Sequence, residues 1–136
     1  MKEKLISFKT AKLAKEKGFD EGTNNGYGKD NEELHWTEYI IFHNRNNGMI
    51  SASTQSLLQK WLRDEHDVYI QISEDFYGDG INHLVQVLIY DANESKNDYF
   101  SIKSSGQWGD NNEFKTYEDA LEKGLQEALN RIELKK

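Results

Sequence analysis

The strongest constraint on the fold is the order of patterns between residues 54 and 133. Two helical patterns, which begin at Thr54 and Thr116, enclose three short runs that are typical of β-strands. A 3.6-residue period places four apolar residues of the first helix on one face: Leu57, Leu58, Trp61 and Leu62. The second helix has a broader apolar stripe, made of Ala120, Leu121, Gly124, Leu125, Ala128, Leu129 and Ile132. Because glycine is unfavourable inside a helix, Gly124 indicates that this helix approaches a sheet closely.

The three runs between the helices predict an antiparallel sheet. Residues 68–73 alternate between apolar and polar side chains, which indicates a half-buried strand. Residues 84–90 are apolar on nearly both faces, so we expect this strand at the centre of the sheet, after a turn at 77–80. Residues 99–103 predict the third strand.

A short helix is expected near the N-terminus. Ser7 can act as its N-cap, and Gly18 stands where a left-handed residue commonly ends a helix. Phe19 can then pack back on Ala14, as in a Schellman ending.

A loop and a hairpin should follow this helix. Residues 20–33 are polar and contain glycine, which predicts a loop. Residues 35–42 are aromatic and β-branched, and a turn at 44–48 joins them to a second short run at 49–51. This pattern favours a β-hairpin over 35–51.

Together these patterns predict an α+β fold. We expect an antiparallel sheet of three or more strands with two helices packed on one face, plus an N-terminal helix and β-hairpin. A chain of 136 residues is most simply one domain, so we expect a single domain over 1–136. Residues 1–51 would form its N-terminal helix and hairpin, and residues 52–136 its α-β-β-β-α core.

Composition narrows the classes of function. The chain has no Cys, which excludes disulfides and thiolate zinc sites, and it has no apolar run of the ~20 residues that cross a bilayer. Its basic start is not followed by the apolar stretch of a signal peptide, so we expect a cytoplasmic protein. The net charge is −7; residues 1–17 carry +4, which leaves −11 for the remainder. An acidic body repels phosphate backbones and disfavours general nucleic-acid binding.

The sequence offers no convincing catalytic, cofactor or metal site. There is no Gly-x-Ser-x-Gly nucleophile motif, and no glycine-rich phosphate loop follows a strand. No two of the four histidines have the helical spacing of a metal-binding pair; they are His35, His43, His66 and His83. Residues 75–86 match a calcium loop only faintly, and a hairpin turn explains them better. We therefore expect no catalytic residue, cofactor or metal, and interpret the histidines as surface or internally bonded groups.

Two groups of side chains are candidates for contacts with a partner. The first is aromatic, and we expect it on the sheet face away from the helices or in loops beside it: Tyr69, Tyr90, Tyr99 and Trp108. In the alternative, the N-terminal helix and the hairpin cover this face. The second is a basic patch on the N-terminal helix: Lys9, Lys12, Lys15 and Lys17.

The element order over 54–133 resembles that of a double-stranded RNA-binding domain. That family places a basic cluster at the start of its final helix to contact phosphates. Here the matching positions hold Tyr117, Glu118, Asp119 and Glu122, with Lys123 as the only positive charge. The turn at 77–80 also lacks the histidine of that family. The resemblance therefore implies a shared arrangement without the RNA-binding lysines.

Three segments are similar to small uncharacterised phage and prophage proteins of gut Bacteroidetes. These segments are residues 12–20, residues 53–63 and residues 117–122, although Ser53 stands where that group would be expected to have proline. The resemblance implies a phage-type origin and a location in a bacterial host cell. Because phage accessory proteins often bind host components, the resemblance also implies a protein partner.

These observations lead to three functional hypotheses. The first is a non-enzymatic accessory protein that binds another protein, with no membrane contact. The alternative is a role related to nucleic acid, either through weak phosphate binding by the basic helix or through an acidic surface that mimics DNA. A third is a small-ligand-binding protein or enzyme, which would require a deep pocket with converging polar groups.

Overall fold

The structure is a computed structural model that describes residues 3–45, 47–77, 80–91, 96–102 and 113–132. Its contacts divide into two compact units. Unit 1 contains residues 1–58 and 129–136, and unit 2 contains residues 59–128. The boundaries fall inside two helices rather than between residues 51 and 52. The number of independently folding domains stays a prediction.

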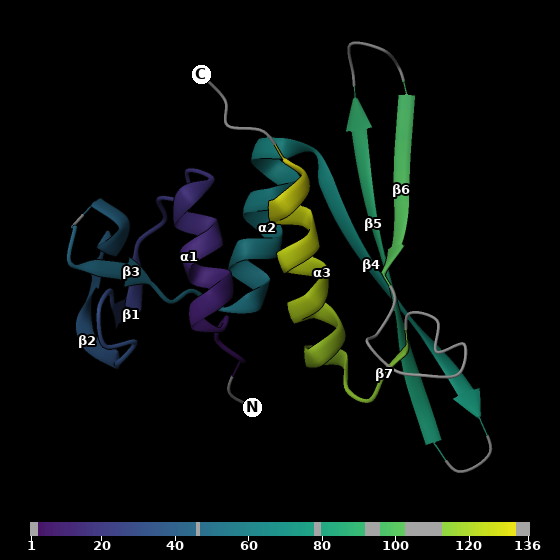
Figure 1. Cartoon of the computed structure of the whole chain (residues 1–136), viewed down its shortest axis with the longest axis horizontal. Coiled ribbons are helices and arrows are strands. Elements are labelled where there is room, and N and C mark those ends of the chain that lie inside the picture. The colour runs from purple at the N-terminus through teal and green to yellow at the C-terminus, as the bar shows by residue number, and fades with distance from the viewer. Residues whose placement is uncertain (1–2, 46, 78–79, 92–95, 103–112, 133–136) are drawn as a thin grey trace. The chain divides into compact units, whose positions relative to one another are not determined.

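Unit 1 contains a helix, a three-stranded antiparallel sheet and a short 3-10 helix. Its elements are α1 (Phe8–Glu16), β1 (Thr23–Gly28), β2 (Leu34–Ile41), η1 (His43–Arg45), β3 (Met49–Ser51) and the first residues of α2 (Gln55–His66). The strand order is β2-β1-β3, so β1 is central (Figure 1). Apolar side chains of α1, β3 and the segments around them are buried in the chain: Ile6, Ala11, Ala14, Phe19 and Ile50.

Helix α1 begins and ends where the sequence predicts. The Ser7 hydroxyl accepts a hydrogen bond from the Thr10 N–H at 3.2 Å, as expected of an N-cap. At the other end Gly18 has φ +95°, and the Phe19 N–H donates to the Ala14 carbonyl at 3.0 Å. This bond closes the Schellman ending, which confirms the predicted role of Gly18.

The hairpin of unit 1 is formed by β1 and β2, whereas the sequence predicts a hairpin of residues 35–42 and 49–51. Strand β1 lies inside residues 20–33, which the sequence assigned to a loop, and it pairs with both β2 and β3. The prediction that residues 35–42 and 49–51 pair with each other was therefore wrong, because β1 lies between them. Its sequence is rich in Asn and Gly, which are uncommon in strands.

A close approach explains one glycine of β1. A Cβ atom on Gly26 would lie 2.5 Å from Cδ2 of the buried His43. A glycine inside a strand commonly marks such a contact. The His43 ring therefore occupies space that any larger residue at position 26 would need.

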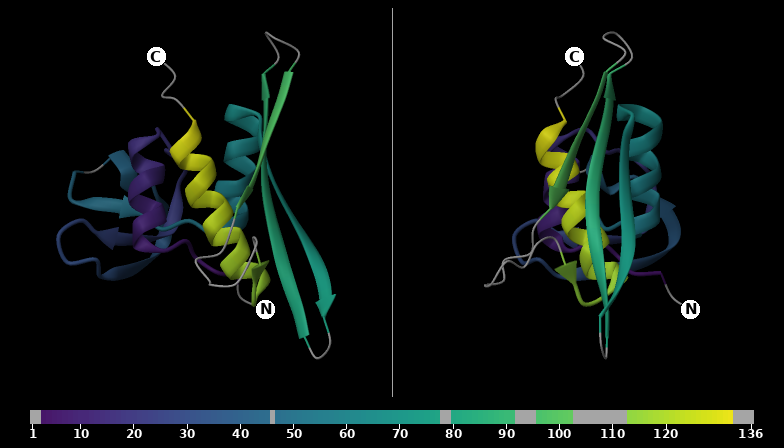
Figure 2. Two further views of the ribbon diagram at one scale, coloured as in Figure 1. Left: turned by 45° about the vertical axis from the view of Figure 1, so that its right-hand side comes forward. Right: turned by 90° about the vertical axis from the view of Figure 1, so that its right-hand side faces the viewer.

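Unit 2 contains an antiparallel sheet with helices on one face (Figure 2). Its elements are the remainder of α2, β4 (Val68–Tyr77), β5 (Gly80–Asp91), β6 (Lys96–Ile102), β7 (Glu113–Phe114) and most of α3 (Tyr117–Arg131). The sheet order is β4-β5-β6, and β7 also pairs with β5. Strand β5 is thus central, as its apolar character on both faces predicts. The α+β class with an antiparallel sheet and helices on one face is confirmed.

Helix α3 packs directly on this sheet. The register places Ile70 opposite Val87 and Ile72 opposite Val85, on the face that the helix covers. A Cβ atom on Gly124 would lie 2.7 Å from Cγ2 of Ile70 and 3.1 Å from Cγ1 of Val85. The close approach predicted from Gly124 is therefore confirmed.

The predicted N-caps of both longer helices are formed. The Leu57 N–H donates to the Thr54 hydroxyl at 3.2 Å, and the Asp119 N–H donates to the Thr116 hydroxyl at 3.0 Å. Asp67 follows α2 with φ +54°, a left-handed conformation that terminates the helix.

Candidate functional site

Strand β2 carries the largest group of exposed apolar side chains among the described residues. Trp36 is 69% exposed, Tyr39 75% and Ile40 59%. Three further apolar side chains of β2 and the residue after it are also exposed: Leu34, Ile41 and Phe42. The pairing of β1 with β2 is irregular between Trp36 and Ile41, so these side chains are exposed at a bulged part of the strand. Large exposed apolar patches commonly mark protein interfaces.

Strand β2 forms backbone hydrogen bonds along one of its two edges, the edge that faces β1. Its backbone pairs with β1, and the side chains of Thr37 and Asn24 add hydrogen bonds at 3.2 Å to each other's backbone carbonyl. A Cβ atom on Gly22 would lie 2.5 Å from Ile40, so Ile40 packs against the chain just before β1. Within the described part of the chain, no strand pairs with the other edge of β2. An edge of this kind can accept an added strand.

The predicted aromatic surface is only partly described. Tyr69 and Tyr90 are exposed, and the backbone register places Tyr69, Leu88 and Tyr99 in one row across the sheet of unit 2. Leu88 and Tyr90 are two residues apart and share a face, opposite to the Ile70 side that α3 covers. The side chain of Tyr99 and the whole of Trp108 lie outside the described residues.

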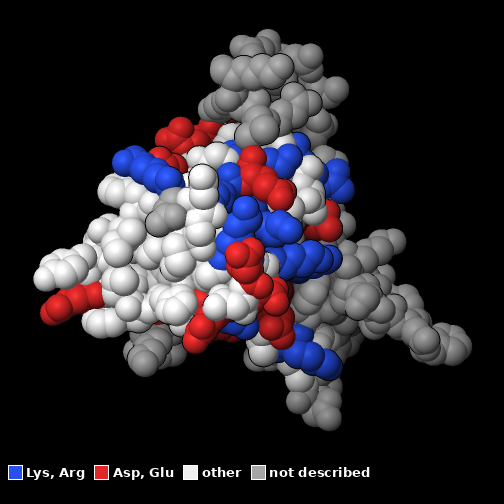
Figure 3. Space-filling view, turned by 60° about the vertical axis from the view of Figure 1, so that its left-hand side comes forward, with Lys and Arg blue, Asp and Glu red and all other residues white. Residues whose placement is uncertain are grey.

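The four lysines of the predicted basic patch have different surroundings. Lys9 and Lys12 are exposed, whereas the Lys15 ammonium donates to the Met49 carbonyl at 2.9 Å. The Lys17 ammonium donates to the Ile132 carbonyl, also at 2.9 Å. On the face shown in Figure 3, Asp and Glu side chains lie beside the Lys and Arg side chains. A continuous phosphate-binding stripe requires a single sign of charge, so this mixture does not favour one.

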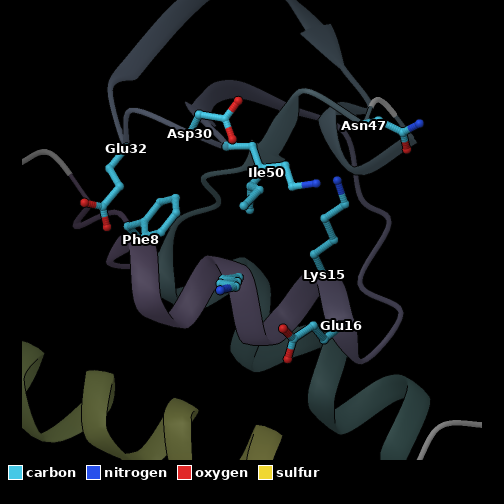
Figure 4. Close-up of a pocket in the computed structure, with 9 residues that line it drawn as sticks. Phe8, Lys15, Glu16, Asp30, Glu32, Asn47 and Ile50 are labelled. Atoms are coloured by element: carbon cyan, nitrogen blue, oxygen red, sulfur yellow. The ribbon is translucent and has the colours of Figure 1, made fainter.

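Unit 1 contains a pocket of about 570 Å³ between α1 and the turn that joins β1 to β2 (Figure 4). Three lysines line it, namely Lys12, Lys15 and Lys29. Phe8 and Ile50 supply apolar surface, and the acidic side chains are Glu16, Asp30 and Glu32. This volume lies within the ~300–1,000 Å³ range of small-molecule sites. Sequence reasoning missed this pocket, because its residues come from three separate segments.

Backbone hydrogen bonds fix the turn between β1 and β2, and this turn places Lys29 beside the pocket. The Gly28 N–H donates to the Glu33 carbonyl at 2.8 Å, and the Glu32 N–H donates to the Gly28 carbonyl at 3.0 Å. Glu32 itself has φ +56°, a left-handed conformation within this turn. The Lys29 N–H donates to the Gly48 carbonyl at 3.1 Å, which ties the turn to the start of β3.

Thr23 of β1, His43 of η1 and Ser51 of β3 form a buried polar cluster in unit 1. The Thr23 hydroxyl lies 2.9 Å from the Ser51 hydroxyl and 3.2 Å from Nδ1 of His43, and all three side chains are buried. Burial lowers the pKa of His43 below its ordinary value of 6.5, and a hydrogen bond with the Ile41 backbone opposes this in part. The cluster pairs its own polar groups, which indicates a structural role.

We expect the stability of the protein to fall as the pH is lowered through about 6.5. The unfolded chain binds a proton on His43 at a higher pH than the folded chain does, so acid favours unfolding. The loss should level off below the folded pKa. Urea unfolding between pH 5 and 8 measures this dependence. The variant His43→Gln should have a shallower slope, and equal slopes in the two proteins would contradict the assignment.

The other histidines occupy unrelated places. His35 is exposed on β2, the His66 ring lies against Trp61 at a centroid distance of 4.7 Å, and Nδ1 of His83 is 3.8 Å from a Glu74 carboxylate oxygen. Among the described residues, no group of three or more His, Asp or Glu side chains is arranged to hold a metal ion. The described helices also include none with the length and apolar character needed to cross a bilayer.

Comparisons with family models, with curated proteins and with solved structures found no match to this chain. The resemblances noted from the sequence therefore stay expectations. Unit 1 carries two features that can contact another molecule, the exposed strand β2 and the lysine-containing pocket.

Proposed function

We propose that this protein is a non-enzymatic accessory protein that binds another protein through strand β2. The observation that carries this proposal is the exposure of Trp36, Tyr39 and Ile40 on an edge strand. A phage-type origin and a cytoplasmic location in a bacterial host are part of the proposal; the origin and the host rest on the sequence resemblance, and the cytoplasmic location also on the N-terminal sequence.

The size of the apolar surface supports this role. Burial of one aromatic side chain removes about 150–250 Å² from water, worth about 4–6 kcal/mol at ~25 cal/mol per Å². Trp36 and Tyr39 are each more than two thirds exposed, so most of this free energy is available to a partner. Association costs about 4–15 kcal/mol in lost freedom of motion, so both anchors and a new set of strand hydrogen bonds are needed.

The partner we propose is an extended, basic segment of a different protein. Such a segment can pair with the outer edge of β2 by strand addition, with its side chains over the aromatic residues. Glu32 and Glu33 precede β2, and Glu38 lies within it. The chain carries a net charge of −7, so two copies repel each other whereas a basic segment is attracted.

Capture from host lysate with a tagged protein tests this proposal. We expect a discrete protein to be captured in the presence of nuclease, and the double variant Trp36→Ala/Tyr39→Ala to lose it. The matched control is Tyr69→Ala/Tyr90→Ala, which removes two exposed aromatics from unit 2 and should retain capture. Circular dichroism of both variants checks that they remain folded.

Two other outcomes of the capture experiment, and one result from light scattering, would contradict the proposal. Loss of capture only in the Tyr69→Ala/Tyr90→Ala variant would move the binding surface to the sheet of unit 2. Capture that disappears with nuclease would favour a role related to nucleic acid and direct attention to Lys9 and Lys12. A dimer in light scattering that Trp36→Ala/Tyr39→Ala converts to a monomer would identify a second copy as the occupant of β2.

A further inference from the structure

The pocket of unit 1 combines charged and apolar surfaces from segments that are distant in the sequence. Lys15 belongs to α1, Lys29 to the turn between β1 and β2, and Ile50 to β3. In Figure 4 the Lys15 side chain extends from α1 toward the opposite wall, and Glu32 lies beside Phe8 at the other end. Glu32 thus lies away from Lys15, whereas Glu16 lies beside Lys15 on α1.

The positive charges of Lys15 and Lys29 act on each other in this pocket. The pKa of Lys15 lies below its ordinary value of 10.5, first because burial disfavours the ammonium and second because the charge of Lys29 repels it. The Lys15 ammonium is fixed by the Met49 carbonyl, and the Lys29 backbone by the Gly48 carbonyl. Neighbouring residues of one segment thus hold the Lys15 ammonium and the Lys29 backbone on the same side of the pocket. An anion between the two ammonium groups would relieve their repulsion.

The apolar wall of the pocket is also fixed by its surroundings. The Phe8 ring meets the Tyr27 ring edge to face at a centroid distance of 5.6 Å. The Tyr27 hydroxyl donates to the Ile6 carbonyl at 2.7 Å, so the ring that supports Phe8 is itself held. Ile50 is buried beneath the pocket. A preformed apolar wall favours a ligand with a flat or compact apolar group, because little ordering is needed on binding.

We propose that this pocket binds a small organic anion, a compound with a phosphate or carboxylate group attached to a compact apolar body. The anionic group lies between Lys15 and Lys29, with Lys12 at the same pocket contributing positive charge. The apolar body contacts Phe8 and Ile50. This site does not depend on the protein partner proposed for β2.

An NMR titration of the ¹⁵N-labelled full chain with phenyl phosphate tests this site. We expect saturable shifts of the amides of residues that line the pocket, with potassium chloride at equal ionic strength as the reference. Inorganic phosphate should bind about 10-fold more weakly, because it lacks the apolar body. Benzyl alcohol, which lacks the anion, should produce no saturable shift. Benzoate in place of phenyl phosphate distinguishes a carboxylate site from a phosphate site.

Two lysine variants make the test specific. Lys29→Met should weaken phenyl phosphate binding about 10-fold or more, because a charged hydrogen-bond donor is lost. Lys9→Met removes an exposed lysine of the same helix that does not line the pocket, so binding should be unchanged. Equal weakening by both variants would show general attraction to lysines and overturn the proposal. The absence of saturable shifts in the original protein would overturn it as well. Dispersed amide spectra confirm that each variant is folded.

Discussion

Replacement of Phe19 by alanine should lower the free energy of unfolding by about 3–5 kcal/mol, the usual cost of truncating a fully buried phenylalanine. Phe19 is 1% exposed and holds unit 1 together in two further ways. Its N–H completes the ending of α1, and its carbonyl accepts a hydrogen bond from the Asn44 side chain at 2.7 Å. The Asn44 side chain also accepts from the Ser51 N–H at 2.8 Å. Loss of the ring therefore removes core packing at the point where α1, η1 and β3 are joined.

Denaturant unfolding followed by circular dichroism measures this loss. The matched control is Phe76→Ala, which removes the same ring from a site that is 75% exposed. The control should cost less than about 1 kcal/mol, the span of strand propensity. Hydrogen exchange would locate the effect, because peptides from unit 1 should lose protection in Phe19→Ala. Equal costs for the two variants would contradict the packing role assigned to Phe19.

The substitution Gly124→Ala should destabilise the protein by about 1–3 kcal/mol, the usual cost of overpacking a core. Two effects oppose each other at this site. Alanine favours a helix by about 1 kcal/mol over glycine, but its methyl group would lie 2.7 Å from Cγ2 of Ile70. Ile70 is β-branched and has few alternative rotamers, so it cannot move aside at low cost. We therefore expect the steric effect to exceed the gain in helix propensity.

A double-mutant cycle with Ile70→Ala separates these two effects. Ile70→Ala removes the methyl group that the new side chain would meet, and its own cost is about 2–5 kcal/mol. In that background, Gly124→Ala should be neutral or stabilising. Asn130→Ala, at an exposed position of α3, serves as a control for propensity alone and should be neutral or slightly stabilising. If Gly124→Ala were stabilising in the original protein, the close contact with the sheet would not constrain this position.

The elements that were predicted correctly are those specified by neighbouring residues. The caps at Ser7, Thr54 and Thr116 need only a hydroxyl and an N–H three residues further along the chain. Gly124 also predicted a structural feature correctly. Glycine is unfavourable inside a helix, so its place in an apolar stripe indicates that another element packs closely against the helix there.

Strand β1 and the surface of β2 were not predicted, because they depend on distant residues. The sequence of β1 has a weak strand signal, and its place in the centre of the sheet is allowed by Gly26 and the ring of His43. Residues 35–42 were recognised as a strand, but an aromatic and β-branched run normally indicates burial. Its exposed side chains Trp36, Tyr39 and Ile40 were therefore not proposed as a surface. The lysine patch was assigned from one helix, whereas the pocket joins Lys15 to Lys29 on another segment.

The sequence by itself determined the class of fold, the ends of the helices and the central place of β5. These features follow from periodicity and capping within a few residues, so they are encoded locally. Only the tertiary structure decided that β1 separates β2 from β3, that β2 is an exposed edge, and that Lys15 and Lys29 face one pocket. The physical reason is that strand pairing and burial depend on which distant segments meet. The backbone N–H and C=O groups that pair two strands are nearly the same in every residue, so they do not by themselves select the partner strand.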